Sequence, residues 1–315
     1  MARAQDVTKS PNQTAIFITM NFKSGGIGQV RDTIADFCGR IPPLTNSMRN
    51  RFPNKDFSIV VGFGARAWKE LFPAAPCPKE LEVFREIKGA KHTAVSTPAD
   101  LFFHIRAKTA DICFEVSSMI HTLLKDIVIP VDEVHGFRYF DNRAIIGFVD
   151  GTENPAADEA ADFALIGGED PYFEGGSYAF IQKYLHNMDV WNAMSTEEQE
   201  KTIGRRKFND LELTDEEKHK NAHNVITKVE QGGEELKIVR ANVSFANASK
   251  GEFGTFFIGY SGKFSTTRTM LEQMFIGTPQ GNSDKILDFS TPKTGALFFI
   301  PSYEVLDRIA NNEWE

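Results

Sequence analysis

The order of strand-like and helix-like segments constrains the fold of this chain more than any single motif does. Residues 14–22, TAIFITMNF, are rich in β-branched and aromatic side chains, which is typical of a strand. The next segment has apolar residues at helical spacing, and Pro42-Pro43 predicts the end of that helix. Further elements are expected in the first half as strands at 56–64, within 93–107 and at 134–140, and as helices at 65–72 and 113–127.

The second half of the chain repeats this theme. Strands are expected at 176–187, 254–262 and 295–302, and helices at 189–205, 265–276 and 303–312. The helices do not alternate with the strands in a strict β-α-β-α rhythm, which favours an α+β fold with antiparallel sheets over a doubly wound parallel sheet. We therefore predict two related α+β halves, residues 1–145 and 146–315.

Composition excludes several classes of function. A formal net charge of −8 without a strongly basic block argues against a nucleic-acid partner. The three cysteines form no CxxC or CxxCH pattern, which argues against a disulfide scaffold, a zinc ribbon and covalent c-type haem. The first residues contain no apolar signal core, and the chain has no 18-residue apolar run. We expect a cytoplasmic protein with no membrane partner.

Three polar residues stand in apolar surroundings where charge is costly. Asp150 follows an apolar run in IIGFVDGTENP, and an Asp-Gly pair after a strand is a common turn. Arg240 and Asn242 lie two apart in an apolar strand, so both side chains project from the same face. A buried arginine needs an anionic partner or access to solvent. It therefore either forms an ion pair with a nearby carboxylate or places a cation in a cavity.

His223 has the most informative surroundings of the seven histidines. Segment 213–233 begins with a capping-box pattern and ends at a glycine pair, which predicts a helix, and apolar residues follow His223. His219 lies four residues earlier, so a helix would place both rings on one face. A two-histidine metal site is thus one alternative, with Asp215 or Glu216 nearby, although the lysines beside His219 oppose a divalent cation.

Ordered blocks of sequence resemble one enzyme family. GFVDG, residues 147–151, matches the GxxDG motif of dye-decolorizing peroxidases, and the match extends through TENP and GGSY. It continues in IGRRKFNDLEL, AHNVITKV, RANVSF, GTFFIGYSG and ILDFSTPKTGALFFIPS, in the family's order. These blocks span residues 141–302, whereas the first half resembles the family in its pattern of strands and helices. The compact length is most similar to the bacterial B-type subgroup.

The resemblance implies a haem b enzyme. Its fold would be two ferredoxin-like halves with antiparallel sheets, of the dimeric α+β barrel type, with haem in the C-terminal half. Carried over by position, His223 corresponds to the proximal iron ligand and Asp150 to the distal acid. Arg240 corresponds to the distal arginine and Asn242 to the neighbouring distal amide.

The resemblance also implies further cofactor contacts. Glu153 and Asn154 lie in a loop that follows the haem edge in the family, and Arg205 corresponds to a partner of a haem propionate. A carboxylate bonds the second nitrogen of the proximal histidine, and either Asp284 or Asp288 fits that role, with Asp284 favoured.

The activity implied is reduction of hydrogen peroxide through a ferryl intermediate, with oxidation of dyes, phenols or other small organic reductants. Asp150 would move a proton between the peroxide oxygens, and Arg240 would supply positive charge. Because aspartate ordinarily has a low pKa, an acidic pH optimum is predicted. Trp191, Tyr178 and Tyr184 are candidate electron relays, with core packing as the alternative role for each.

Two other functions remain alternatives at this point. The first is a haem-binding or haem-handling protein whose peroxidase activity is incidental, which would need His223 but no distal acid or cation. The second is a ferredoxin-like interaction module with the two-histidine metal site. Family members are often homo-oligomers, so we expect one here. The chain ends in YEVLDRIANNEWE, and we see no tail that would target an encapsulating shell.

Overall fold

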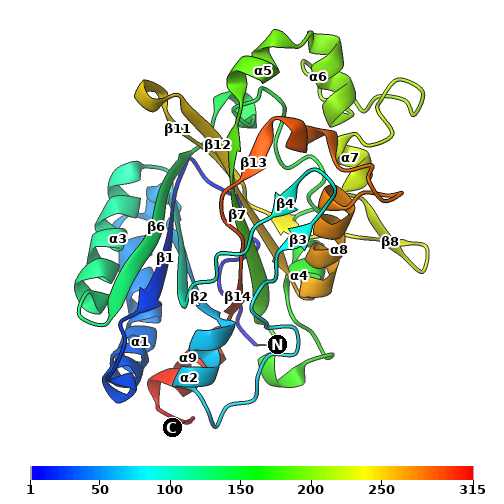
Figure 1. The fold of residues 1–315 in the computed structure, drawn as a ribbon. Helices are drawn as coiled ribbons and strands as arrows, with labels where there is room; N and C mark the ends of the chain where they lie inside the picture. The colour runs from blue at the N-terminus through cyan, green and yellow to red at the C-terminus, as the bar shows by residue number, and fades with distance from the viewer. Residues whose placement is uncertain (1, 315) are drawn as a thin grey trace.

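The computed structural model describes residues 2–314 as a mixed α/β fold (Figure 1). The strands are β1 (Thr14–Phe22), β2 (Ser58–Gly64), β3 (Ile87–Lys88), β4 (Thr93–Ala94), β5 (Leu101–Ala107), β6 (Val128–Phe137), β7 (Ser177–His186), β8 (Val229–Gln231), β9 (Glu234–Leu236), β10 (Val239–Arg240), β11 (Val243–Asn247), β12 (Glu252–Ser261), β13 (Ser290–Pro292) and β14 (Ala296–Ile300). The helices are α1 (Ile27–Arg51), α2 (Ala65–Leu71), α3 (Ala110–Leu124), α4 (Ala160–Ala164), α5 (Met188–Ala193), α6 (Thr196–Ile203), α7 (His223–Ile226), α8 (Phe264–Phe275) and α9 (Tyr303–Ala310).

Eight antiparallel strands close into a barrel. The first half contributes four of them in the order β6-β1-β5-β2, and the second half contributes β14-β7-β12-β11. The two sheets join where β14 pairs with β2 and where β11 pairs with β6, at Ser244 and Phe137. The prediction of two α+β halves with antiparallel sheets, of the dimeric α+β barrel type, is confirmed. The boundary between residues 145 and 146 remains a proposal.

Side chains alternate between the barrel interior and its outer face, as the period of a strand requires. On β5, Phe102 belongs to the interior cluster, whereas Phe103 and Ile105 belong to the larger outer core. Phe17 and Phe256 stack inside the barrel with ring centroids 4.0 Å apart. Each fully buried Phe contributes about 1.5–3 kcal/mol of hydrophobic free energy, so the many phenylalanines of this chain stabilise both layers.

The helices cover the barrel on separate sides (Figure 1). Helix α3 packs on β1 and β5, and α9 packs on α1. Helix α8 lies instead against β7 and β12, with α7 beside it. The outer face of β7 and β12 therefore faces α8 and α7, and the candidate site lies there.

Helix α1 differs from its prediction. It continues through Pro42 and Pro43 to Arg51 rather than ending at the prolines. Two prolines leave two carbonyl groups without helical donors and cost several kcal/mol in an isolated helix. Residues on both sides of the prolines, including Ile41 and Met48, are buried in the outer core. Burial of this face offsets the cost, which a local sequence pattern does not reveal.

Segment 213–233 also differs from its prediction, because no long helix forms. Thr214 and Glu217 make the capping-box contacts, with the Thr214 N–H donating to Glu217 Oε2 at 3.1 Å, but only a turn follows. The helix is confined to α7, and Gly232 and Gly233, both at positive φ, form the turn between β8 and β9. His219 therefore lies outside α7.

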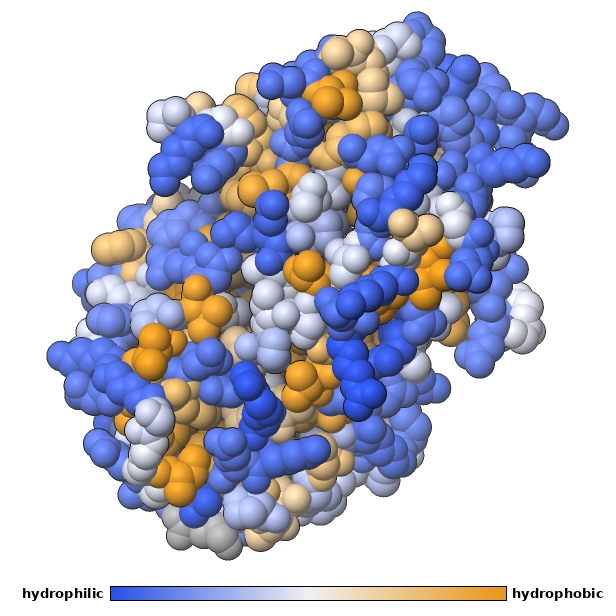
Figure 2. Space-filling view, viewed as in Figure 1, coloured by the Kyte–Doolittle hydropathy of each residue, from blue (hydrophilic) through white to orange (hydrophobic). Residues whose placement is uncertain are grey.

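The face seen in Figure 2 is mainly hydrophilic, with hydrophobic residues in small scattered groups. Phe208 is the most exposed large apolar residue, at 92%. Within residues 2–314, no helix has the length and apolar character needed to cross a membrane.

Candidate active site

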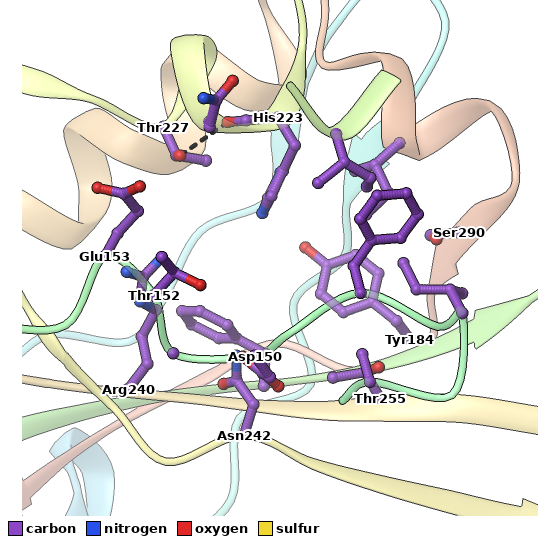
Figure 3. Close-up of a pocket in the computed structure, with 18 of the residues that line it drawn as sticks. Asp150, Thr152, Glu153, Tyr184, His223, Thr227, Arg240, Asn242, Thr255 and Ser290 are labelled. Atoms are coloured by element: carbon purple, nitrogen blue, oxygen red, sulfur yellow. Dashed lines mark hydrogen bonds between the residues drawn. The ribbon is translucent and has the colours of Figure 1, made fainter. Parts of the chain in front are cut away.

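A large cavity lies between α7 and α8 on one side and the outer face of β7 and β12 on the other. Its space free of protein atoms is about 1230 Å³, open solvent included. The loop 144–153 closes one side, and Ile238 and Phe257 are among the apolar residues that line it. His223 points into the cavity from one wall, and Asp150, Arg240 and Asn242 lie across from it (Figure 3).

His223 is held by a buried carboxylate. It is the first residue of α7, and its Nδ1 lies 2.7 Å from Asp284 Oδ2. The Asp284 side chain is 0% exposed, and its other oxygen accepts from the Ile286 N–H at 3.0 Å. An ionised carboxylate is only an acceptor, so Nδ1 donates the hydrogen of this bond, and Nε2 is the ring nitrogen that faces the cavity. Asp288, the alternative partner, instead bonds His92 at 3.2 Å.

Asp150 is fixed on the opposite wall. Asn242 Nδ2 donates to Asp150 Oδ1 at 3.2 Å, and Asn242 Oδ1 accepts from the Ile258 N–H at 3.1 Å. The amide therefore ties the carboxylate to β12. Gly151 follows at φ +85°, so the Asp-Gly pair also turns the chain, as its sequence predicted. The turn and the cavity-facing carboxylate are the same feature.

Arg240 is placed by an asparagine from the same loop. Asn154 Oδ1 accepts from the Arg240 N–H at 2.9 Å and from Nε at 3.3 Å, while Asn154 Nδ2 donates to the Arg240 carbonyl at 2.8 Å. Burial lowers the pKa of Arg240, and the charges of Asp150 and Glu153 oppose that shift. In the part of the chain that the structure describes, Arg240 forms no salt bridge. Of the two interpretations of this arginine, the structure supports the cation in a cavity.

Arg205 and Glu153 form an ion pair at the edge of the cavity. Arg205 Nη2 donates to Glu153 Oε1 at 2.5 Å, and Nη1 donates to the Asp210 carbonyl at 2.7 Å. Arg205 Nε is buried and has no partner among the described residues. Asn224, beside His223, has a buried Oδ1 that also lacks a partner within residues 2–314. A buried polar atom without a partner is costly, so these atoms fit a polar ligand group at this edge.

One titratable cavity residue, His186, was not identified from the sequence, and Tyr184 was not expected to line the cavity. His186 bonds Ser290 Oγ through Nδ1 at 2.8 Å and Thr255 Oγ1 through Nε2 at 2.9 Å. Burial lowers the pKa of His186 to about 4. Gln182, in the same strand, accepts a hydrogen bond from Tyr184, which was predicted only as a relay. Tyr184 and His186 both line the cavity, and their period-two spacing on β7 was the available signal.

Other predicted residues lie apart from the cavity-lining set. His219 bonds Glu198 at 2.7 Å, so the two-histidine helix face does not form and that interpretation was wrong. No group of three His, Cys, Asp or Glu residues that could hold a metal ion occurs within residues 2–314. Trp191 is buried and donates to the Ile146 carbonyl at 2.9 Å. Tyr178 is also buried, at the opposite end of β7 from Tyr184.

Comparison with known proteins covers nearly the whole chain. The family models of the Dyp-type peroxidase N-terminal and C-terminal regions match residues 5–138 and 141–305. A dye-decolorizing peroxidase of Mycobacterium tuberculosis is 48% identical over 296 residues, which are 93% of this chain and 86% of that protein.

Solved structures give the same result. The crystal structure of a dye-decolorizing peroxidase from Bacteroides thetaiotaomicron superposes with a TM-score of 0.95 at 56% identity, covering 98% of this chain and 99% of that one. A variant of DypB from Rhodococcus jostii RHA1, in complex with heme, gives a TM-score of 0.92 at 44% identity over 97% of this chain and 99% of that one. This chain belongs to the Dyp-type peroxidase family.

Proposed function

We propose that the protein is a haem b peroxidase that reduces hydrogen peroxide and oxidises dyes, phenols or other small organic reductants. The observation that carries the proposal is the pairing of His223 with buried Asp284, directly across the cavity from Asp150 and Arg240. The heme complex of the similar Rhodococcus jostii protein supports the choice of cofactor. Its placement in the cytoplasm remains an expectation from the sequence.

The residues present fit haem. The cavity offers a histidine ring nitrogen on one wall, apolar lining from residues such as Phe257 and Leu271, and a polar edge. His223 Nε2 would bind the iron, and Arg205 Nε, a buried donor without a partner among the described residues, would donate to a propionate. When bound, haem supplies an iron centre that takes up peroxide and its oxidising equivalents.

Asp284 acts on the iron through His223. The carboxylate that accepts the Nδ1 hydrogen raises the basicity of Nε2 and fixes the ring orientation. Because Asp284 is itself held by the Ile286 N–H, the ring cannot rotate without breaking its hydrogen bond to a fixed carboxylate. Loss of this carboxylate would weaken iron binding and the electron donation that favours O–O cleavage.

Asp150 and Arg240 act on the peroxide side. Asp150 accepts a proton from the peroxide oxygen that approaches the iron and returns it to the oxygen that leaves. The Arg240 guanidinium would stabilise the negative charge that develops on the leaving oxygen. Asn242 and Asn154 hold these two groups in place, so the wall is organised before peroxide arrives.

A second cavity reaches the same wall. Its space free of protein atoms is about 580 Å³, open solvent included, and Asp150, Arg240 and Asn242 line it as well as the larger cavity. Arg138 and buried Ser244 also line it, and Ser244 Oγ has no partner among the described residues. This polar lining suits peroxide and water, and a bulky dye would donate its electrons from outside.

The test is a spectrum of the purified protein after expression with haem supplied. We expect a Soret band, a rapid change on adding one equivalent of peroxide, and its reversal by a phenol. Absence of the Soret band would favour an interaction module. A Soret band that peroxide leaves unchanged would favour a haem-handling protein.

A further inference from the structure

A histidine and a tyrosine form a buried pair inside the barrel, outside the candidate active site. His104 on β5 and Tyr260 on β12 are both 0% exposed, and His104 Nδ1 lies 2.8 Å from the Tyr260 hydroxyl. Their rings are nearly parallel, with an interplanar angle of 14°, and Phe17 stacks on His104 at 4.4 Å. His104 Nε2 is buried without a partner within residues 2–314. A buried polar pair with an unpaired atom is costly and calls for an explanation.

The hydrogen bond runs from tyrosine to histidine. If His104 donated through Nδ1, both the Tyr260 hydroxyl hydrogen and the Nε2 lone pair would be left unpaired. If Tyr260 donates, only the Nε2 hydrogen is unpaired, so this arrangement leaves fewer orphaned groups. Burial and the charge of Arg106 hold the pKa of His104 well below its usual value. The imidazole is therefore neutral, and its Nδ1 is a base in contact with the phenol.

The pair lies close to the cavity wall that carries Arg240. Val239 pairs with Tyr260, and Arg240 pairs with Gly259, in the register of β10 and β12. Neighbouring strands are roughly 5 Å apart, so Tyr260 lies one strand spacing and one residue from the distal arginine. Its ring faces the barrel interior, whereas Phe257 on the same strand lines the cavity. A short protein path thus connects the pair with the proposed haem site.

Tyr260 differs from the other tyrosines in having a proton acceptor. Among the described residues, no other tyrosine hydroxyl bonds an imidazole. Tyr184 lines the cavity and is nearer to the proposed haem, but its hydroxyl donates to Gln182 Oε1 at 2.5 Å. A phenol that loses an electron becomes a strong acid and must release its proton. An amide oxygen does not take that proton, whereas a neutral imidazole does.

We propose that Tyr260 and His104 form a redox-active pair that stores an oxidising equivalent inside the barrel when no reductant is present. This inference rests on the proposed peroxidase function, which supplies the oxidant. One electron passes from Tyr260 to the haem centre that peroxide has oxidised, and the phenol proton passes to His104 Nδ1. The products are a neutral tyrosyl radical, an imidazolium and a haem centre reduced by one electron. An external reductant returns one electron to Tyr260, and the proton returns from His104.

The experiment uses the haem-loaded wild-type protein labelled with ¹⁵N-histidine. One equivalent of peroxide is added without reductant, the sample is frozen, and the radical is examined by electron paramagnetic resonance and electron-nuclear double resonance. We expect a tyrosyl radical with hyperfine coupling to one ¹⁵N imidazole. Because this measurement needs no substitution, it does not depend on whether variants of a buried pair fold.

Variants then identify the residues. Tyr260→Phe should lose the radical, and His104→Gln should lose or shift it, because the amide accepts a hydrogen bond but no proton. Tyr178→Phe is the matched control, since Tyr178 is equally buried but lies on β7 away from the cavity. The Soret change with peroxide is followed in each sample as a measure of the peroxidase reaction.

The outcomes separate this inference from the proposed function. A radical that persists in Tyr260→Phe, that disappears in Tyr184→Phe, or that shows no imidazole coupling overturns the pair. Absence of any radical in wild-type protein whose Soret band has responded to peroxide overturns it too. A Soret band that does not respond refutes the proposed function, and the pair with it, because its oxidant is then missing.

Discussion

His223 Nδ1 lies 2.7 Å from Asp284 Oδ2, although 61 residues separate them in the chain. The carboxylate is fully buried, and a backbone N–H from Ile286 holds its second oxygen. A group fixed in this way sets both the tautomer and the orientation of the imidazole. The properties of the proposed iron ligand therefore depend on a residue that does not itself reach the cavity.

Asp284→Asn tests this dependence. The amide still accepts the Nδ1 hydrogen but carries no charge, so we expect a higher haem reduction potential and a peroxide reaction slower by about 10- to 100-fold. Redox titration and stopped-flow absorbance measure the two effects. Asp288→Asn is the control, because Asp288 bonds His92 instead and should leave both values unchanged. Equal effects of the two substitutions would contradict the assignment of Asp284.

Asp150→Asn and Arg240→Leu test the distal wall. We expect Asp150→Asn to lower the rate constant of the peroxide reaction by roughly 10²–10⁴, because the proton shuttle is lost. Arg240→Leu should lower it by about 10²–10³, because the leaving oxygen loses its stabilising charge. Stopped-flow measurements at equal haem occupancy give both values. Asp158→Asn, an exposed change in the same loop region, is the control. Wild-type rates in both variants would show that the distal roles assigned to Asp150 and Arg240 are wrong.

Asn154→Ala tests whether Asn154 positions Arg240. The substitution removes three hydrogen bonds between Asn154 and Arg240, including those to the backbone N–H and carbonyl of Arg240. Each buried polar group left unpaired costs roughly 1–3 kcal/mol. We expect a slower peroxide reaction in the single variant. If Asn154 acts through Arg240, adding Asn154→Ala to Arg240→Leu should have little further effect, as a double-mutant cycle would show. Strictly additive effects would assign Asn154 an independent role.

His186 should make the free energy of unfolding depend on pH. Its pKa is about 4 in the folded protein and about 6.5 when unfolded, so the unfolded chain binds more protons between these values. The free energy of unfolding should therefore fall by about 3 kcal/mol as the pH drops from 6.5 to 4. Urea unfolding of wild-type protein and His186→Gln, followed by circular dichroism at pH 7 and 4.5, checks this. A pH dependence that is the same in both proteins would exclude His186 as its source.

Much of the fold was predicted from local sequence patterns, because the formation of many strands and helices depends on residues that are close in the sequence. The strand predicted at 14–22 is β1, and the strand at 176–187 contains β7. Prediction failed where distant packing overrides local preference. Helix α1 passes two prolines because both flanks are buried in the outer core. The helix expected over 213–233 shrinks to α7, because Gly232 and Gly233 turn a hairpin instead.

Site residues that belong to a sequence motif were predicted. Residues that only the fold brings together were missed. Asp150 and His223 came from ordered blocks, and the structure places both on the cavity. His186 has no motif of its own, and its partners come from β12 and β13. His104 and Tyr260 are 156 positions apart, so no window of sequence shows their contact.

The two strand pairs that join the halves of the barrel, β2 with β14 and β6 with β11, determine when the protein can complete its fold. Until the second half exists, β2 and β6 each have one unpaired edge, since their outer partners are β14 and β11. Exposed edges of this kind recruit other chains, and pairings between distant segments form slowly. During synthesis the β6 edge therefore stays open until residues 243–247 emerge, and the β2 edge stays open until residues 296–300 emerge. We expect the nascent chain to depend on chaperones or on dilution over that interval.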